Sequence, residues 1–457
     1  MRERRVEPGF SASYTRNRMK LQNILLAFSI FVSAAAQPLH IDIPFEKFVL
    51  DNGLTVIVHE DRKAPIVAVN MWYHVGSKNE KPGKTGFAHL YEHLMFGGSE
   101  NAKGSYIKAM EKIGATDLNG TTNYDRTNFF EDVPTNALDR ALFMESDRMG
   151  HFINAFDKST LDLQRGVVQN EKRQGDNEPY GSAWELIPAS TYPAKHPYSW
   201  PVIGSMEDLN AASLEDVKDW FRSYYSPSNA VIVLAGDIDA KTAREKVTKY
   251  FGDIPAGPPV ERQEAWPAKM TGVHRQQIQD RVPQARVFKI WNVPGFGTAD
   301  ADYLDLLSDI LTKGKVSRLY QRLVYTDQLA TSVYSFVDTS EIGSQFYIDA
   351  TARPGQDLNK LEKAIDEEIA RLLSTGPTNA ELKRVQTQYA ANFMRGMQRI
   401  GGFGGKSDLL AQAEVFTGDP SYRFKTSFNR HEQATPAEVK ASGNQWLAEF
   451  PISYRCS

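Results

Sequence analysis

The chain has 457 residues, of which 41% are hydrophobic, and its formal net charge at pH 7 is only −3. These values are typical of a soluble globular protein of two or three domains and give no indication of nucleic-acid binding. The single cysteine, Cys456, excludes an internal disulfide bond.

Residues 1–36 predict a signal peptide. An apolar run at residues 24–32 follows basic side chains and precedes small residues that suit cleavage, namely Arg16, Arg18, Lys20, Ala34, Ala35 and Ala36. The run is too short for a permanent membrane anchor, and Met19 is an alternative start. A mitochondrial presequence is the competing interpretation, but such segments are poor in acids, whereas Glu3 and Glu7 are present here. We therefore expect a secreted protein of a bacterial periplasm.

Two strands joined by a tight turn are predicted next. Asp51, Asn52 and Gly53 separate the apolar residues 48–50 from residues 54–58, and these three residues are typical of a turn. Residues 66–73 form a β-branched and aromatic run that suits a buried strand.

The segment TGFAHLYEHLMFGG, residues 85–98, predicts a short apolar helix with a metal-binding motif. His89 and His93 are four residues apart, so they lie on one face of the helix and can bind one ion. Two histidines, a third protein ligand and an open position for water are what a catalytic zinc site requires. Glu92 lies beside them, where it can act as the general base for the attacking water. This order, His-x-x-Glu-His, is the inverted form of the commoner zinc-peptidase motif.

A histidine pair at this spacing can also arise by chance. The surrounding sequence favours a metal site, because Glu92 in an apolar helix would be a buried acid unless an ion or a proton neutralised it. The third ligand must then come from another helix. Glu171, in a helix predicted for residues 161–173, is the best candidate.

The remainder of the first half predicts an α+β domain. Ser105 is a candidate cap for a helix at residues 106–113, and apolar residues at helical spacing follow Pro134. Residues 231–235 predict a buried strand. We place the zinc-binding catalytic domain at residues 37–254 and a proline-rich linker at residues 255–270.

The second half, residues 271–457, is predicted to repeat the first without its chemistry. Residues 287–291 predict a strand, and residues 303–311 predict a helix in the place of the histidine-bearing helix. At the positions of His89, Glu92 and His93, this helix has Asp305, Ser308 and Asp309. No second zinc site is therefore expected.

Two later features concern helix ends. A helix is predicted at residues 358–373, and Thr378 and Glu381 form a capping box that predicts a long helix to about residue 399. The segment GGFGGKS, residues 401–407, is not a phosphate-binding loop, because the motif needs glycine where Ile400 stands and a strand before it. Helix-terminating glycines account for it.

Seven ordered motifs resemble those of the pitrilysin and insulinase family of zinc peptidases. They are DNGLTVIVHED, HLYEH, TTNYDRTNFFEDVP, VVQNEKR, NEPYG, HPYSWPVIGS and YYSPSNAVIVLAGDID, and the resemblance spans residues 45–450. It implies one Zn2+ per chain, bound by His89, His93 and Glu171, with Glu92 as the base. It also implies an α+β fold of two related domains, each an antiparallel-type sheet packed with helices, that form half of a clamshell. The short two-domain members include the zinc-bearing subunits of heterodimeric bacterial peptidases and of the mitochondrial processing peptidase.

The resemblance also implies a substrate-binding strand. In the family an edge strand pairs with the main chain of an extended substrate, and the matching residues here are Asn119, Gly120 and Thr121. An ordinary strand and turn is the alternative interpretation.

Two departures from the family pattern concern the active site. Active members usually have a second glutamate seven residues before the third ligand, where this chain has Gln164. We expect this change to weaken zinc positioning or transition-state stabilisation by roughly ten- to a hundredfold rather than to abolish binding. Members with a self-sufficient site carry an Arg and a Tyr at the positions of Val324 and Thr331. We therefore expect a homologous partner subunit that supplies this pair.

These features predict a secreted zinc metalloendopeptidase subunit that hydrolyses peptides or small unfolded proteins as part of a heterodimer. A homodimer is less favoured, because it would hold two zinc sites and no Arg and Tyr pair. The rival interpretation is a non-catalytic structural or chaperone-like subunit of the same fold. Gln164, Val324 and Thr331 favour the rival, whereas the intact set of four metal-site residues disfavours it.

Overall fold

Residues 41–272, 274–449 and 451–456 are described by the structure, which is a computed structural model. The signal peptide predicted at residues 1–36 lies outside the described residues. Of the helices that the structure describes, none has the length and apolar character needed to cross a membrane.

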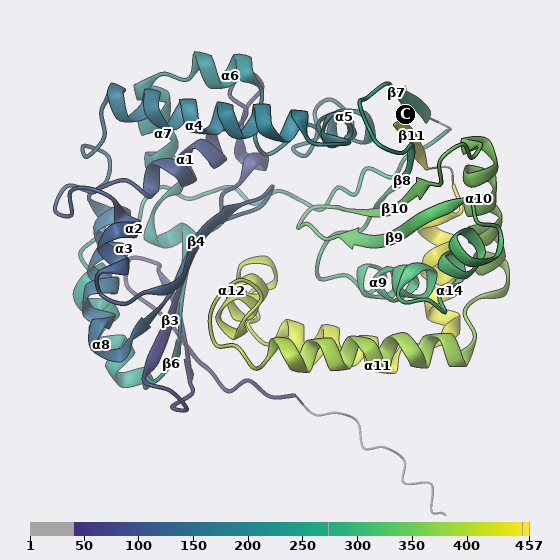
Figure 1. The fold of residues 1–457 in the computed structure, drawn as a ribbon. Coiled ribbons are helices and arrows are strands. Elements are labelled where there is room, and N and C mark those ends of the chain that lie inside the picture. The colour runs from purple at the N-terminus through teal and green to yellow at the C-terminus, as the bar shows by residue number, and fades with distance from the viewer. Residues whose placement is uncertain (1–40, 273, 450, 457) are drawn as a thin grey trace, which may run out of the picture. The chain divides into compact units, whose positions relative to one another are not determined.

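The first sheet has six strands in the order β1-β2-β6-β3-β5-β4 (Figure 1). The strands are β1 (Glu46–Val49), β2 (Thr55–Glu60), β3 (Ile66–Tyr73), β4 (Thr116–Thr122), β5 (Thr127–Pro134) and β6 (Ala230–Gly236). β2 and β6 pair in parallel, and the other neighbours are antiparallel. β3 and β6 are central and buried along almost their whole length, which explains their continuous apolar sequences. The predicted strands at residues 48–50, 54–58, 66–73 and 231–235 are thus confirmed.

Helices of the first half cover one face of this sheet and its end (Figure 1). They are α1 (Phe87–Met95), α2 (Tyr106–Glu111), α3 (Leu138–Gly150), α4 (Lys158–Asn177), α5 (Gly181–Thr191), α6 (Met206–Ala211), α7 (Leu214–Tyr224) and α8 (Ala240–Phe251), with short 3-10 turns η1 (Ser77–Asn79), η2 (Thr135–Ala137) and η3 (Pro227–Asn229). Ser105 accepts a hydrogen bond from the backbone N–H of Lys108, so the predicted cap of α2 is confirmed.

A buried ionic cluster lies inside this helical layer. Glu131 of β5 and Glu145 of α3 are both fully buried, and Arg148 donates from Nε to Glu145 over 3.0 Å. Tyr106 also donates to Glu145, over 2.7 Å. Burial and the adjacent charge of Glu145 raise the pKa of Glu131 well above its usual range. The burial of Glu131 beside Glu145 thus favours its protonated form.

The second sheet has five strands in the order β7-β11-β8-β10-β9 (Figure 1). The strands are β7 (His274–Ile278), β8 (Arg286–Val293), β9 (Ala330–Asp338), β10 (Ser344–Ala352) and β11 (Ile452–Cys456). This order matches β2-β6-β3-β5-β4 of the first sheet strand for strand. The parallel pair is again the same one, β7 with β11. The predicted repeat is therefore confirmed at the level of topology.

The helical elements of the second half are α9 (Ala299–Thr312), the π-helix η4 (Tyr320–Thr326), α10 (Leu358–Thr375), α11 (Asn379–Gly396), α12 (Lys406–Thr417), the π-helix η5 (Arg423–Ser427), α13 (Phe428–Gln433) and α14 (Pro436–Leu447). The capping box of Thr378 and Glu381 is present, but α11 ends at Gly396, before the predicted end near residue 399. Gly402 and Gly404 have positive φ angles of 68° and 75° in the turn that follows. α12 then packs on β3 and β6 of the first sheet (Figure 1).

A second buried ionic cluster joins the two halves of the chain. Lys78 of η1 donates to Asp125 over 3.2 Å and also pairs with Glu341, which lies between β9 and β10. His74 contacts Glu341 over 2.7 Å. Burial alone would raise the pKa of Glu341, but the hydrogen bond from His74 and the nearby positive charges lower it to about 2. Residues 255–270, the predicted linker, form neither helix nor strand, and the domain boundaries themselves stay a prediction.

Candidate metal centre

Helix α1 presents the two histidines, and its first turn is held by a residue outside the helix. Its N-cap, Gly86, has a left-handed φ of 86° and no side chain that could cap the helix. The carboxylate of Glu80 takes this role, accepting from the N–H of Gly86 over 3.1 Å and from that of Ala88 over 2.9 Å. Trp200 donates to the same carboxylate over 3.0 Å. Burial raises the pKa of Glu80 to about 8, although these N–H donors oppose the effect.

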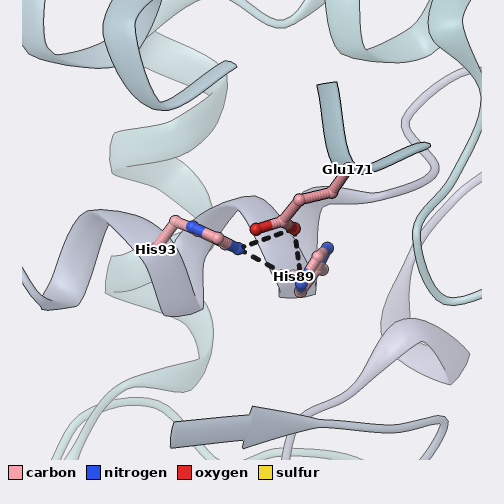
Figure 2. Close-up of side chains that lie close together, drawn as sticks. All are labelled: His89, His93 and Glu171. Atoms are coloured by element: carbon pink, nitrogen blue, oxygen red, sulfur yellow. Dashed lines mark hydrogen bonds and ion pairs between the residues drawn. The ribbon is translucent and has the colours of Figure 1, made fainter. Parts of the chain in front are cut away.

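Figure 2 shows His89 and His93 of α1 directed at Glu171 of α4. Nε2 of His93 lies 3.3 Å from Nε2 of His89 and 3.2 Å from Oε2 of Glu171, and the remaining distance, from His89 to Glu171, is 3.7 Å. Ligand atoms at about 2.0–2.2 Å from a tetrahedral ion lie about 3.3–3.6 Å apart. The three side chains therefore fit a zinc-sized ion without rearrangement. Among the described residues, these three form the one group of three or more His, Cys, Asp or Glu side chains that lie close enough together to share an ion.

The electrostatic surroundings keep His89 in the form that binds metals. Burial and the adjacent His93 lower the pKa of His89 to about 4, so the imidazole is neutral at pH 7. Its Nδ1 is buried and has no hydrogen-bond partner among the residues that the structure describes. Gln164, on α4 two turns before Glu171, is half-buried.

Glu92 lies between the two histidines on α1 and is only 8% exposed. Its Oε2 accepts a hydrogen bond from the hydroxyl of Thr122 over 2.6 Å. Burial raises the pKa of Glu92, and this hydrogen bond opposes the increase. The carboxylate is thus held in one orientation by β4, the strand next to the helix that carries the two histidines.

β4 is one of the two edge strands of the first sheet, as the predicted substrate-binding role requires. Asn119, Gly120 and Thr121 all pair with β5, which leaves their other side at the sheet edge. A Cβ on Gly120 would lie 2.9 Å from the ring of Phe96 and 3.0 Å from that of Phe129, so only glycine fits there. The edge backbone is therefore placed directly beside α1.

The second half shows no equivalent of this site in its described residues. Asp305 of α9 contacts His431 over 3.3 Å, and Asp309 pairs with Lys313 over 2.5 Å. Both side chains are thus engaged in ion pairs within the second half and do not form a metal-binding group.

The segment expected to carry an Arg and a Tyr is the π-helix η4 and the start of β9. Val324 lies in η4 and Thr331 in β9. The neighbouring Arg322 is engaged by Asp327, over 3.3 Å, and by Glu367. Tyr334, three residues after Thr331 on the strand, is 60% exposed, and the pairing of β9 with β10 is irregular at Thr331.

Three residues of this site have no motif of their own in the sequence. Glu80 and Trp200 support the start of α1, and Thr122 orients Glu92. The sequence does hold one indication of a residue such as Glu80. A helix that begins at glycine, without a Ser, Thr or Asp cap, needs a hydrogen-bond acceptor from elsewhere in the chain.

Two family models match this chain. The model described as insulinase, peptidase family M16, matches residues 55–202, which include all four residues of the predicted metal site. The model described as peptidase M16 inactive domain matches residues 211–389.

Individual relatives agree with these matches. Zinc protease PqqE of Helicobacter pylori is 30% identical over 381 residues, which cover 81% of this chain and 84% of that protein. The uncharacterized zinc protease YmxG of Bacillus subtilis is 26% identical over 376 residues, which cover 80% of this chain and 88% of that protein.

Solved structures show the same fold. The crystal structure of a protease from Helicobacter pylori has a TM-score of 0.82 at 26% identity, covering 91% of this chain and 100% of that one. The periplasmic protease PqqL from Escherichia coli has a TM-score of 0.74 at 19% identity, covering 92% of this chain and 48% of that one. At the latter identity the likeness concerns the fold alone.

Proposed function

The chain belongs to the insulinase family of peptidases, family M16, and on this basis we propose that it is the zinc-bearing subunit of a secreted metalloendopeptidase. The observation that carries the proposal is the convergence of His89, His93 and Glu171 beside the buried Glu92. Relatives named zinc proteases support zinc as the ion. A periplasmic location agrees with the predicted signal peptide and with the name of PqqL, a periplasmic protease.

In this proposal one ion per chain is held by Nε2 of His89, Nε2 of His93 and Oε2 of Glu171. When bound, zinc supplies Lewis acidity, which makes water acidic enough to attack a carbonyl near neutral pH. The neutral state of His89 suits this role, because a protonated imidazole cannot bind a metal.

Glu92 moves the proton in the proposed reaction. Thr122 occupies its Oε2, which leaves Oε1 to accept a proton from the attacking water and to deliver it to the nitrogen of the leaving amine. The hydrogen bond from Thr122 holds the carboxylate beside β4, the strand on which the substrate would lie.

The substrate is proposed to add a strand at the edge of β4. Main-chain pairing with Asn119, Gly120 and Thr121 would select extended or unfolded chains and tolerate many sequences. The absence of a side chain at Gly120 supports this, because α1 approaches the strand closely there.

A homologous partner subunit is proposed to complete the site. Val324 and Thr331 cannot bind a substrate carbonyl as Arg and Tyr do, and Arg322 is already paired with two carboxylates. A partner of the same fold would supply the missing pair. A homodimer would not, because both copies lack it.

A non-catalytic subunit is the second candidate function. One specific observation favours it: among the residues that the structure describes, the buried Nδ1 of His89 has no acceptor of the kind that normally orients a metal-binding imidazole. Such a subunit would bind zinc and still be inactive in the presence of its partner.

Peptide hydrolysis by the purified chain, alone and with a co-expressed homologue, tests the proposal. Glu92→Gln should lower kcat by roughly 100- to 10,000-fold while the bound zinc measured by mass spectrometry stays at one equivalent. Glu111→Gln, an exposed residue at the end of α2, is the matched control and should change neither value. Zinc-bound protein that is inactive in both preparations would favour the non-catalytic function, and zinc-free protein would refute the metal site.

A further inference from the structure

A cleft of about 500 Å³ lies where the start of β4 and the end of β5 meet the segment that follows α11. Its walls are partly acidic, with Asp117 from β4 and Asp132 from β5, and partly apolar, with Met394, Met397 and Ile400. The proposed reaction does not use any of these residues. Asn128, which shares a face of β5 with Asp132, contacts Asp408 of α12, so the cleft lies on the face of the first sheet on which α12 packs.

Asp132 is the unusual residue of this cleft. It is only 9% exposed, and in the part of the chain that the structure describes no group donates a hydrogen bond to its buried Oδ1. Gly401 packs directly on this carboxylate, because a Cβ there would lie 1.7 Å from Oδ1. A buried carboxylate without a partner destabilises a fold unless something binds to it.

A second carboxylate is brought to the same place by an irregularity of the edge strand. The pairing of β4 with β5 shifts register between Thr116 and Asn119, and Asp117 within this bulge has a positive φ of 49°. Burial and the charge of Asp117 raise the pKa of Asp132 to about 6, while Arg399 lowers it. Asp61 and Lys63 also line the cleft and pair with each other, so one guanidinium remains for two carboxylates and the lining keeps one excess negative charge.

We propose that this cleft binds the cationic side chain of a lysine or arginine in the substrate, about five residues from the scissile bond. The inference rests on the proposed function, because it places the substrate along β4. Thr122, which contacts Glu92, and Asp117 are five positions apart on this strand. At about 3.3 Å per residue, the cleft therefore lies about 17 Å along the peptide from the reacting bond.

The length of a substrate side chain and the residues that line the cleft decide which side chains can bind there. Neighbouring strands are about 4.8 Å apart, so a peptide added beside β4 would lie about 10 Å from Asp132 on β5. Only a long side chain spans that distance. Met394, Met397 and Ile400 offer apolar contacts to its methylene groups, while the two carboxylates receive its charge.

Binding of peptides to Glu92→Gln protein tests this inference independently of catalysis. The probes are acetylated and amidated peptides of roughly 14 residues, long enough to cover five positions on either side of the cut. Each is uncharged except for one arginine, which is moved along the sequence, and has a counterpart with citrulline at that position. Acetylation removes the terminal ammonium, so that only the side chain can supply the charge. Affinity is measured by fluorescence anisotropy.

We expect one arginine position to bind about tenfold more tightly than its citrulline counterpart, and Asp132→Asn to remove this preference. Asp61→Asn is the matched control, because Asp61 lines the same cleft but is already paired with Lys406 at 2.8 Å and Lys63 at 3.1 Å. It should keep the preference, and Arg399→Gln should increase it.

Equal affinity for arginine and citrulline at every position, or a preference that survives in Asp132→Asn, would overturn the inference. Cleavage of the same peptides by protein with Glu92 intact is a separate measurement. Its failure would count against the proposed function and would leave the binding result to decide the role of the cleft.

Discussion

Replacing Asp132 by asparagine should stabilise the protein at neutral pH and have almost no effect in acid. Burial, together with the charge of Asp117, raises the pKa of Asp132 from its ordinary value of 3.8 to about 6. Between these two values the unfolded chain loses the proton first, so the free energy of unfolding falls as the pH rises. Above about pH 6 the loss is complete. Asparagine resembles the protonated acid and cannot ionise, so the variant does not lose this stability as the pH rises.

The magnitude follows from the size of the pKa difference. Two pKa units at about 1.4 kcal/mol each set an upper limit of about 3 kcal/mol on the gain in the free energy of unfolding. Little of this is screened by solvent, because Asp132 is only 9% exposed. Most single substitutions destabilise a protein, so a gain of this size is itself diagnostic.

Urea unfolding followed by tryptophan fluorescence, at pH values from about 4 to 8, would measure the effect. The difference between the variant and the unaltered protein should grow with pH and level off above about pH 6. A difference that does not depend on pH, or a variant that is less stable at pH 7, would show that the folded protein does not disfavour the charged form of Asp132. That result would also remove the reason for a binding cleft.

Four further variants test other buried acids. Glu131→Gln should keep or raise the thermal midpoint, since burial and Glu145 disfavour the charged form of Glu131, whereas Glu145→Gln should lower it by removing the ion pair with Arg148. Glu80→Ala should weaken zinc affinity, measured by chelator competition, about tenfold, because the first N–H groups of α1 lose their acceptor; unchanged affinity would contradict this. Glu341→Gln should reduce the free energy of unfolding at pH 7 by up to about 3 kcal/mol, and the difference in urea midpoint should vanish as the pH falls from about 4.5 to about 2, where Glu341 itself becomes protonated.

The first sheet was more predictable from sequence than the second, for a physical reason. β3 and β6 are buried on both faces, and such strands have continuous apolar sequences that are easily recognised. β7 has the sequence HRQQI and is almost fully exposed, so no hydrophobic pattern marks it. The capping boxes and the histidine spacing could be predicted from sequence because each is defined by residues only a few positions apart in the chain.

Contacts between distant segments were not readable in the same way. The hydrogen bond from Thr122 to Glu92 and the packing of Gly401 on Asp132 depend on how strands and loops meet in three dimensions. Single polar residues in a strand or turn have no periodicity that could signal such a contact. Glu171 could be predicted only because a zinc site needs a third ligand and a family resemblance indicated its helix.

The position of β6 has a consequence for the order in which the protein assembles. This strand lies between β2 and β3, yet the chain must extend from Tyr73 to Ala230 before it exists. His89, His93 and Glu171 all precede it, so during synthesis these side chains are present before the sheet that supports them can close. Closing so long a loop is slow relative to helix formation. Insertion of β6 is therefore expected to limit the folding rate, and tight metal capture should be a late event rather than the nucleus of folding.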